Sequence, residues 1–350
     1  MIYLDNAAST PIHKDVLTEM LPFLAEQYGN PSSIHKLGRT ANKAIQNARK
    51  QIANLINAQA DEIFFTSGGT ESNNITLYGF AYAKKGNHVI TSSIEHEAVL
   101  EPCKRLEKDG LSVTYLPVSS DGLVDPMDVK NAITKDTCLV SIMFANNEVG
   151  TVQPIKDISK ICKEKQIPFH SDAVQAVGKM PIDVKDLELS AMSISSHKLN
   201  GPKGIGALYI KKGIKIEPLI LGGGQENGIR SGTENVASIV GFGKACELAK
   251  ENLQKNIVHL KSLRDSLVSK ITSEIPHVSF NGNREKRIPN NAHFTFLGVN
   301  GEDLIIKLDE NEIAASTGSA CSVKIQKASH VLKAMGFSHE QITGSLRLTV

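Results

Sequence analysis

Short β-rich runs alternate with helical runs between Asp61 and Ile210, among them EIFFT (62–66), HVITS (88–92), SVTYL (112–116) and TCLVSIM (137–143). Strands that alternate with helices pair mostly in parallel, because each helix returns the chain to the starting edge of the sheet. Before these runs, apolar residues recur at three- and four-residue intervals: Leu37, Ala41, Ala44, Ile45, Ala48, Ile52 and Leu55. Such a helix packs on a sheet. The pattern predicts an α/β fold whose largely parallel sheet is covered on both faces.

The sequence changes character after Thr233. A long helical pattern runs to about Ile271, and shorter strands such as AHFTF (292–296) and a helical segment from Glu302 to Asp309 follow it. We therefore expect a large domain over residues 15–255 and a smaller α/β domain made of residues 1–14 and 256–350. The boundary falls inside the long helix, where no Pro or Gly marks it.

The composition limits the classes of protein to consider. The 350 residues are 41 % hydrophobic, and 39 Lys and Arg nearly balance 37 Asp and Glu, so neither a nucleic-acid groove nor a membrane anchor is expected. No apolar run approaches the roughly 20 residues that cross a bilayer, and residues 1–5 do not resemble a signal peptide. A cytoplasmic protein is expected. Five cysteines, odd in number and without a CxxC pair, indicate reduced thiols rather than a disulfide framework or a zinc site.

The segment TSGGTES (66–72) follows a strand and opens a helix. Its glycines let the backbone approach a ligand, and the free N–H groups at the start of a helix favour an anion. Gly69 and Thr70 are therefore candidates for a phosphate seat. An ordinary helix cap and tight turn would use the same residue types.

Two more candidate side chains follow predicted buried strands. Asp172, in HSDAVQ (170–175), lies at the carboxyl edge where α/β proteins bind ligands, and it could pair with a protonated ring nitrogen or simply cap a helix. Lys198, in SSHKLNGPKG (195–204), follows an apolar strand. Apolar surroundings would let this lysine lose its proton and form an imine with a carbonyl cofactor, although most lysines are simply solvated.

Cys321 differs from the other cysteines in its surroundings. It lies in STGSACS (316–322), a run of small residues typical of an exposed loop, where its thiol could reach a partner or be a spectator. The other four lie within helical or strand patterns, where cysteine usually acts as a small buried hydrophobe: Cys103, Cys138, Cys162 and Cys246.

An ordered set of motifs closely resembles the cysteine desulfurase family of fold type I pyridoxal-phosphate enzymes: GGTES (68–72), IEH (94–96), NNEVG (146–150), HSDAVQ (170–175), SSHK (195–198), RSGT (230–233) and GSAC (318–321). The resemblance covers nearly the whole chain, including YLDNAAST (3–10) and YGNPSS (28–33). It implies a large domain with a mostly parallel seven-stranded sheet, a smaller C-terminal domain that carries the Cys321 loop, and pyridoxal 5′-phosphate as cofactor.

The resemblance implies roles around the ring of that cofactor. Lys198 would hold the cofactor as a Schiff base and move protons, and Asp172 would keep the pyridine nitrogen protonated so that the ring withdraws electrons. His96 would stack on the ring and exchange protons with the substrate. Gln175 would bond the phenolic oxygen.

The resemblance also implies which residues bind the ends of cofactor and substrate. Arg347 would bind the carboxylate of L-cysteine in a bidentate fork, with Asn147 close by on the other side of the cofactor. A homodimer is implied, because one phosphate ligand would come from a second subunit. The phosphate ligands would be Gly69, Thr70, Ser195 and His197, with Thr233 of the second subunit.

Cys321 would attack the substrate sulfur, which leaves alanine and an enzyme persulfide. Because an unperturbed thiol is only a few per cent thiolate at neutral pH, this step needs a lowered pKa or a proton acceptor such as His96. The sulfur would pass to an acceptor protein, such as an iron–sulfur scaffold, for cluster assembly or tRNA thiolation. No resident metal is expected, since Cys321 alone could serve only transiently as one ligand of an iron–sulfur cluster.

Two departures and several rival functions accompany the resemblance. The loop SVKIQK (322–327) is unusually basic and apolar, which leaves the identity of the acceptor open. The chain stops at Val350, where family members usually continue into a further helix, so we expect either a truncated C-terminus or a trimmed small domain. Selenocysteine lyase or class V aminotransferase activity on the same scaffold is the nearest alternative. A non-catalytic scaffold protein for clusters or nucleotides is the alternative of another class.

Overall fold

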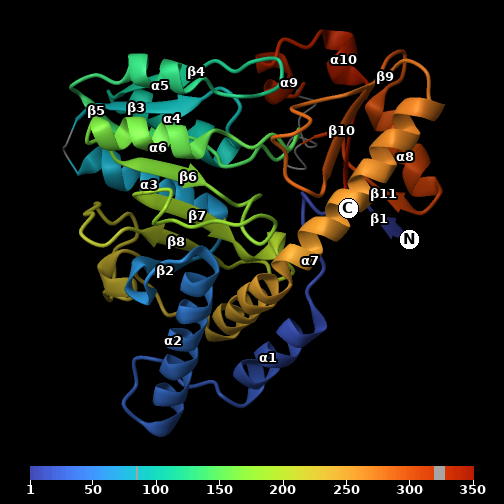
Figure 1. The fold of residues 1–350 in the computed structure, drawn as a ribbon. Coiled ribbons are helices and arrows are strands. Elements are labelled where there is room, and N and C mark those ends of the chain that lie inside the picture. Colours follow the sequence, from blue (N-terminus) through green and yellow to red (C-terminus); the bar gives the residue numbers. More distant parts are fainter. Residues whose placement is uncertain (84–85, 319–327) are drawn as a thin grey trace.

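The computed structural model describes residues 1–83, 86–318 and 328–350, and its largest feature is a seven-stranded sheet (Figure 1). The strands, in spatial order, are β2 (Ile63–Thr66), β8 (Gly206–Ile210), β7 (Ala191–Ser195), β6 (Phe169–Asp172), β5 (Thr137–Ser141), β3 (His88–Ser92) and β4 (Ser112–Leu116). The strands from β7 to β4 pair in parallel, whereas β8 pairs antiparallel with both β7 and β2. The predicted α/β fold with a mostly parallel seven-stranded sheet is confirmed.

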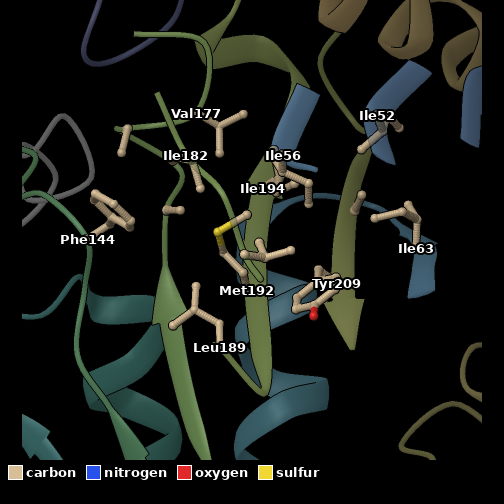
Figure 2. Close-up of a cluster of buried hydrophobic side chains, with 14 of the residues drawn as sticks. Ile52, Ile56, Ile63, Phe144, Val177, Ile182, Leu189, Met192, Ile194 and Tyr209 are labelled. Atoms are coloured by element: carbon tan, nitrogen blue, oxygen red, sulfur yellow. The ribbon is translucent and has the colours of Figure 1, made fainter. Parts of the chain in front are cut away.

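Helices cover both faces of this sheet. They are α2 (Lys36–Ile56), α3 (Gly69–Tyr82), α4 (Glu97–Lys108), α5 (Pro126–Ala132), α6 (Ile155–Glu164) and α7 (Val236–Glu274). Ile63 and Phe65 of β2 pack in the core cluster that includes α2, α5, α6 and α7, whereas Phe64 packs in the cluster of α3 and α4. This alternation is the two-residue period of a strand buried on both faces. Figure 2 shows part of the first cluster, which includes Ile56 of α2 and Ile194 of β7.

Helix α7, with 39 residues, is the longest helix in the described part of the chain, and it runs from the large sheet toward the smaller sheets (Figure 1). Its first half crosses α2 and α1 (Lys14–Ala25) at close range. A Cβ on Gly243 would lie 2.6 Å from Cα of Ala48, and a Cβ on Gly241 would lie 2.5 Å from Sδ of Met20. The predicted domain boundary between residues 255 and 256 falls inside this helix, and the division of the chain into two domains stays a prediction.

Two smaller sheets lie beyond the second half of α7. The first is antiparallel, in the order β12 (Ser345–Thr349), β10 (Asn291–Phe296) and β9 (Val278–Phe280), and the second pairs β1 (Ile2–Tyr3) with β11 (Ile313–Ala314) in parallel. The remaining short elements are α8 (Gly301–Glu310), α9 (His330–Ala334), α10 (His339–Thr343), η1 (Ala60–Glu62), η2 (Ser196–Lys198) and η3 (Glu226–Gly228). Asp5 forms a bridge with Thr349, so the N-terminal segment lies against β12.

None of the helices within 1–83, 86–318 and 328–350 combines the length and the apolar character that a membrane span requires.

Candidate active site

A cavity of about 200 Å³ opens at the carboxyl ends of the parallel strands of the large sheet. Loops that follow neighbouring parallel strands converge at this edge, which is where α/β proteins bind ligands. Most of the residues predicted from the sequence line this one cavity: Gly69, Thr70, His96, Asn147, Asp172, Gln175, Ser195, His197, Lys198 and Arg347. Residues from six separate segments of the chain are therefore neighbours, although their individual roles stay predictions.

The predicted anion seat lies where β2 turns into α3. Gly68 has a φ of 156°, which residues with a side chain rarely adopt, and a Cβ on Gly69 would lie 2.7 Å from Cγ2 of Val174. Both positions therefore need glycine. Thr70 follows in the first turn of this 14-residue helix, whose unpaired N–H groups and dipole favour a negatively charged group. The turn is therefore suited to a phosphate.

Asp172 ends β6, and two donors fix its buried carboxylate. The backbone N–H of Val174 donates to Oδ1 at 3.0 Å, and Nδ2 of Asn73 in α3 donates to Oδ2 at 2.7 Å. Donors to the ionised carboxylate stabilise its negative charge. A fixed anion at this point of the cavity can pair with a protonated ring nitrogen.

His197 and Lys198 lie in the 3-10 turn η2, directly after β7. Nζ of Lys198 donates to the carbonyl oxygens of Ala7 and Ala8, both at 2.6 Å, and Nδ1 of His197 lies 3.3 Å from Oγ of Ser9. Burial, and next the positive charge of Lys198, lowers the pKa of His197 to about 4, so that the ring is neutral at neutral pH. Residues 7–9 thus form one wall of the lysine site.

His96 is the N-cap of α4, and Nδ1 of its ring accepts a hydrogen bond from the N–H of Ala98 at 3.0 Å. A neutral ring that accepts at Nδ1 carries its proton on Nε2, so this arrangement makes Nε2 a proton donor. The preceding residue, Glu95, is completely buried, and Oε1 accepts from Oγ of Ser92 at 2.6 Å and from the N–H of Met143 at 2.9 Å. Burial raises the pKa of Glu95 to about 8.

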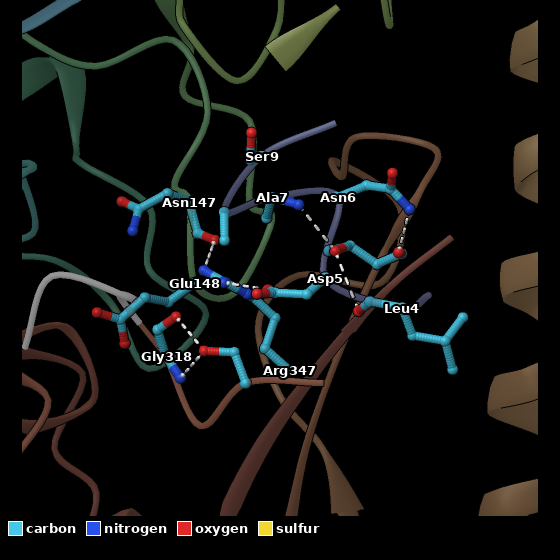
Figure 3. A network of polar contacts seen from close by, with 12 residues as sticks. Leu4, Asp5, Asn6, Ala7, Ser9, Asn147, Glu148, Gly318 and Arg347 are labelled. Carbon is cyan, nitrogen blue, oxygen red and sulfur yellow. Dashed lines mark hydrogen bonds and ion pairs between the residues drawn. The ribbon is translucent and has the colours of Figure 1, made fainter. Parts of the chain in front are cut away.

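Arg347 of β12 reaches the cavity from the C-terminal part of the chain, and its side chain is only 1 % exposed. As Figure 3 shows, the guanidinium lies between Asn147 and Asp5. One terminal nitrogen donates to the carbonyl oxygen of Asn147 at 2.9 Å, and the other donates to Oδ1 of Asp5 at 2.8 Å. The Nε atom is buried, and no partner for it lies in the described part of the chain. The remaining N–H groups of this cation could bind a carboxylate.

Two predicted residues are not part of this cavity. Thr233 is exposed, in the segment between η3 and α7, and it is absent from the cavity wall formed by the described residues. Cys321 lies outside the described residues. The described residues on either side of its segment both approach Glu148: Oγ of Ser329 donates to Oε2 at 2.5 Å, and a Cβ on Gly318 would lie 3.1 Å from the same oxygen.

The structure adds residues that sequence reasoning missed. Asp5 and Asn73 each bind a predicted site residue, and Lys179 donates to Oε1 of Gln175. Asp5 lies in a quoted motif and Asn73 directly follows one, so those motifs carried a weak signal, whereas Lys179 lies four residues beyond its nearest motif. The sequence could not show which residues would be hydrogen-bond partners, since Asp5 and Arg347 are 342 positions apart.

The cavity fits pyridoxal 5′-phosphate, the cofactor that the resemblance implies. It offers a helix N-terminus for the phosphate, a fixed carboxylate for the ring nitrogen and a lysine for the aldehyde carbon. Oδ1 of Asn73 and Nε of Arg347 are buried and have no hydrogen-bond partner among the described residues, as expected where a polar ligand completes a site.

Comparisons with known proteins identify the family of the chain. The family model Aminotransferase class-V matches residues 2–347. "Cysteine desulfurase IscS" of Dictyoglomus turgidum is 54 % identical over 351 residues, covering 100 % of this chain and 89 % of that protein, and the protein of the same name from Methanosarcina thermophila is 52 % identical over 351 residues, covering 100 % and 87 %. Among solved structures, "NIFS-LIKE PROTEIN" superposes with a TM-score of 0.94 at 41 % identity, covering 100 % of this chain and 93 % of that chain. "SspA in complex with cysteine" gives 0.88 at 39 % identity, covering 100 % and 99 %. The chain therefore belongs to the cysteine desulfurases, within the class-V aminotransferase family.

Proposed function

We propose that this chain is a pyridoxal-phosphate-dependent cysteine desulfurase that converts L-cysteine and the thiol of Cys321 into L-alanine and a persulfide on Cys321. The observation that carries the proposal is the convergence of Lys198, Asp172 and Arg347 on one cavity. Relatives named as cysteine desulfurases, and the similar structure of SspA in complex with cysteine, support L-cysteine as the substrate.

Different residues of the cavity bind different parts of the cofactor. The first turn of α3 binds the phosphate, with Ser195 and His197 beside it, and Asp172 keeps a proton on the ring nitrogen. When bound, the cofactor supplies an electron-poor ring that stabilises negative charge on the substrate Cα. Lys198 would hold the aldehyde carbon of the cofactor, and its amine nitrogen would move a proton at the substrate Cα.

Arg347 and His96 act on the substrate. The guanidinium binds the substrate carboxylate through N–H groups that neither Asp5 nor Asn147 occupies, which orients the Cα and Cβ atoms. His96 lines the cavity, and its neutral ring would donate a proton through Nε2. Asp5 and the carbonyl of Asn147 hold the guanidinium in place.

Cys321 receives the sulfur. Its thiolate forms an S–S bond with the substrate sulfur while the Cβ–S bond breaks, the electron pair of that bond stays with the carbon, and protonation of the carbon gives alanine. The described cysteines are poor candidates for this nucleophile, because all are buried and burial raises their thiol pKa: Cys103 and Cys162 to about 12, with Cys138 and Cys246 also raised.

The proposal includes two protein partners, a second copy of this chain and a sulfur acceptor. We expect a homodimer in which Thr233 reaches the phosphate site of the second subunit, and its exposed position supports this role. A sulfur-acceptor protein, such as an iron–sulfur scaffold, takes the persulfide sulfur onward. The expectations of a cytoplasmic location and of no direct nucleic-acid or membrane partner remain predictions from the sequence.

The visible absorption spectrum before and after addition of L-cysteine tests cofactor and substrate together. With pyridoxal phosphate loaded, we expect the spectrum to change and alanine and persulfide to form in equal amounts in a single turnover. Lys198→Ala should abolish turnover, and Cys321→Ala should keep the cofactor spectrum but lose the persulfide, whereas the matched control Cys103→Ala should retain both. Normal sulfur transfer by Cys321→Ala would refute the assigned nucleophile. Activity only with selenocysteine, or transamination without sulfur release, would refute the proposed reaction.

A further inference from the structure

Lys179 is a buried cation that the proposed chemistry does not use. It lies in the turn after β6, four residues beyond Gln175, and is only 7 % exposed. Its ammonium donates to Oε1 of Gln175 at 3.1 Å. No carboxylate within the described ranges lies at ion-pair distance from it. A lysine in such a place costs free energy of folding, because a buried charge without a counter-charge is poorly solvated.

The contact decides which way the Gln175 amide points. A lysine nitrogen presents donors, so the amide end that faces Lys179 must be the oxygen. The NH₂ end then faces the other way, and Nε2 of Gln175 donates to the carbonyl oxygen of Ala7 at 3.0 Å. That same oxygen accepts from Nζ of Lys198 at 2.6 Å. The amide N–H groups and the nitrogen of the cofactor lysine are therefore neighbours on one carbonyl.

We propose that Lys179 is a positioning residue: by binding Oε1 of Gln175 it fixes the amide so that its N–H donors, and not its oxygen, face the phenolic oxygen of the bound cofactor. The inference rests on the proposed function, because it presupposes a cofactor bound at Lys198. An ionised phenolic oxygen accepts hydrogen bonds, whereas a flipped amide would place a second acceptor against it and repel it.

The charge state of Lys179 does not alter this role. Burial, and next the positive charges of Lys198 and Arg347, lowers the pKa of Lys179 to about 7. Both the ammonium and the neutral amine carry N–H donors, so the oxygen of Gln175 keeps a donor in either form. The neutral amine also carries a lone pair, so in that form the carbonyl oxygen of Ala7, which can only accept, keeps the NH₂ end of Gln175 in place.

The test is a double-mutant cycle read out on the bound cofactor rather than on turnover. Lys179→Met removes the donor and keeps a long apolar side chain, and Gln175→Leu removes the amide. For Lys179→Met we expect the pH midpoint of the cofactor's visible absorption change to rise by about one unit, and the dissociation constant of pyridoxal phosphate to rise about tenfold, which is the loss of one hydrogen bond. In the Gln175→Leu background, the same Lys179→Met substitution should change neither quantity.

Two outcomes would overturn the inference. Equal shifts in both backgrounds would mean that Lys179 acts through its charge alone, and no shift in the wild-type background would mean that it only fills space. If Lys179→Met does not fold, Gln175→Glu probes the same contact, because it keeps an acceptor for Lys179 but offers no N–H, and it should raise the midpoint likewise. A wild-type protein that shows no visible absorption with pyridoxal phosphate would instead refute the proposed function.

Discussion

The ion pair between Asp5 and Arg347 gives a quantitative prediction. Arg347 is 1 % exposed, and its 2.8 Å contact with Oδ1 of Asp5 supplies its negative partner. Removing one partner of a buried pair costs about 3–5 kcal/mol, because the other charge stays buried. Asp5 itself is 18 % exposed, and Asp5→Asn keeps an oxygen acceptor, so we expect a smaller loss of about 2 kcal/mol in the free energy of unfolding.

Urea unfolding of the cofactor-loaded protein, at one fixed protein concentration, measures this loss. Asp15→Asn is the matched control: it removes the same charge from a side chain that is 51 % exposed and lies 3.8 Å from His13, and it should cost less than about 1 kcal/mol. In an Arg347→Gln background, Asp5→Asn should cost almost nothing. An unchanged cost in that background would refute the reasoning, because Asp5 would then stabilise the fold through other contacts.

Three further outcomes are expected. Gly69→Ala should weaken binding of pyridoxal phosphate about tenfold in a fluorescence titration, because its Cβ would lie 2.7 Å from Val174 and push the seat apart, and unchanged affinity would contradict the close contact. The folded-state pKa of Glu95 is raised to about 8. The free energy of unfolding of the wild type, relative to that of Glu95→Gln, should therefore fall as pH rises from about 4.5 to 8. A difference that does not change with pH would contradict burial of a neutral carboxyl. The folded-state pKa of Lys179 is lowered to about 7, so the free energy of unfolding of the wild type, relative to that of Lys179→Met, should rise from about pH 7 to 10.5. Urea midpoints at four pH values measure this trend, and a fall over the same range would contradict a lowered pKa.

The sheet and the cavity edge could be predicted because they depend on local patterns. Apolar runs such as residues 62–66 and 88–92 mark buried strands, and parallel strands bring their carboxyl ends together, so Asp172 and Lys198 could be placed at the same edge. The direction of β8 could not be predicted from the sequence: this strand lies between β2 and β7 and runs antiparallel to both. A hairpin and a crossover leave similar apolar runs.

The supporting contacts of the site escaped prediction for a different reason. Asn73 orients Asp172 across 99 positions, and Asp5 meets Arg347 across 342. No periodicity links residues so far apart, and each polar side chain has many surface roles that would suit it equally well. Only the packed fold shows which pairs are buried together.

Helix α7 has a mechanical consequence. Gly241 and Gly243 let it pass within contact distance of α1 and α2, which makes this crossing a fulcrum. From Gly243 to Glu274 the helix extends about 46 Å, so a tilt of about 5° at the crossing would displace its far end by about 4 Å. That end packs against β9 and β10, and β10 pairs with the strand that carries Arg347. A side chain added at either glycine would therefore push α7 away from α1 or α2 and tilt it. The tilt would move the Arg347 guanidinium relative to Lys198, although neither glycine lines the cavity.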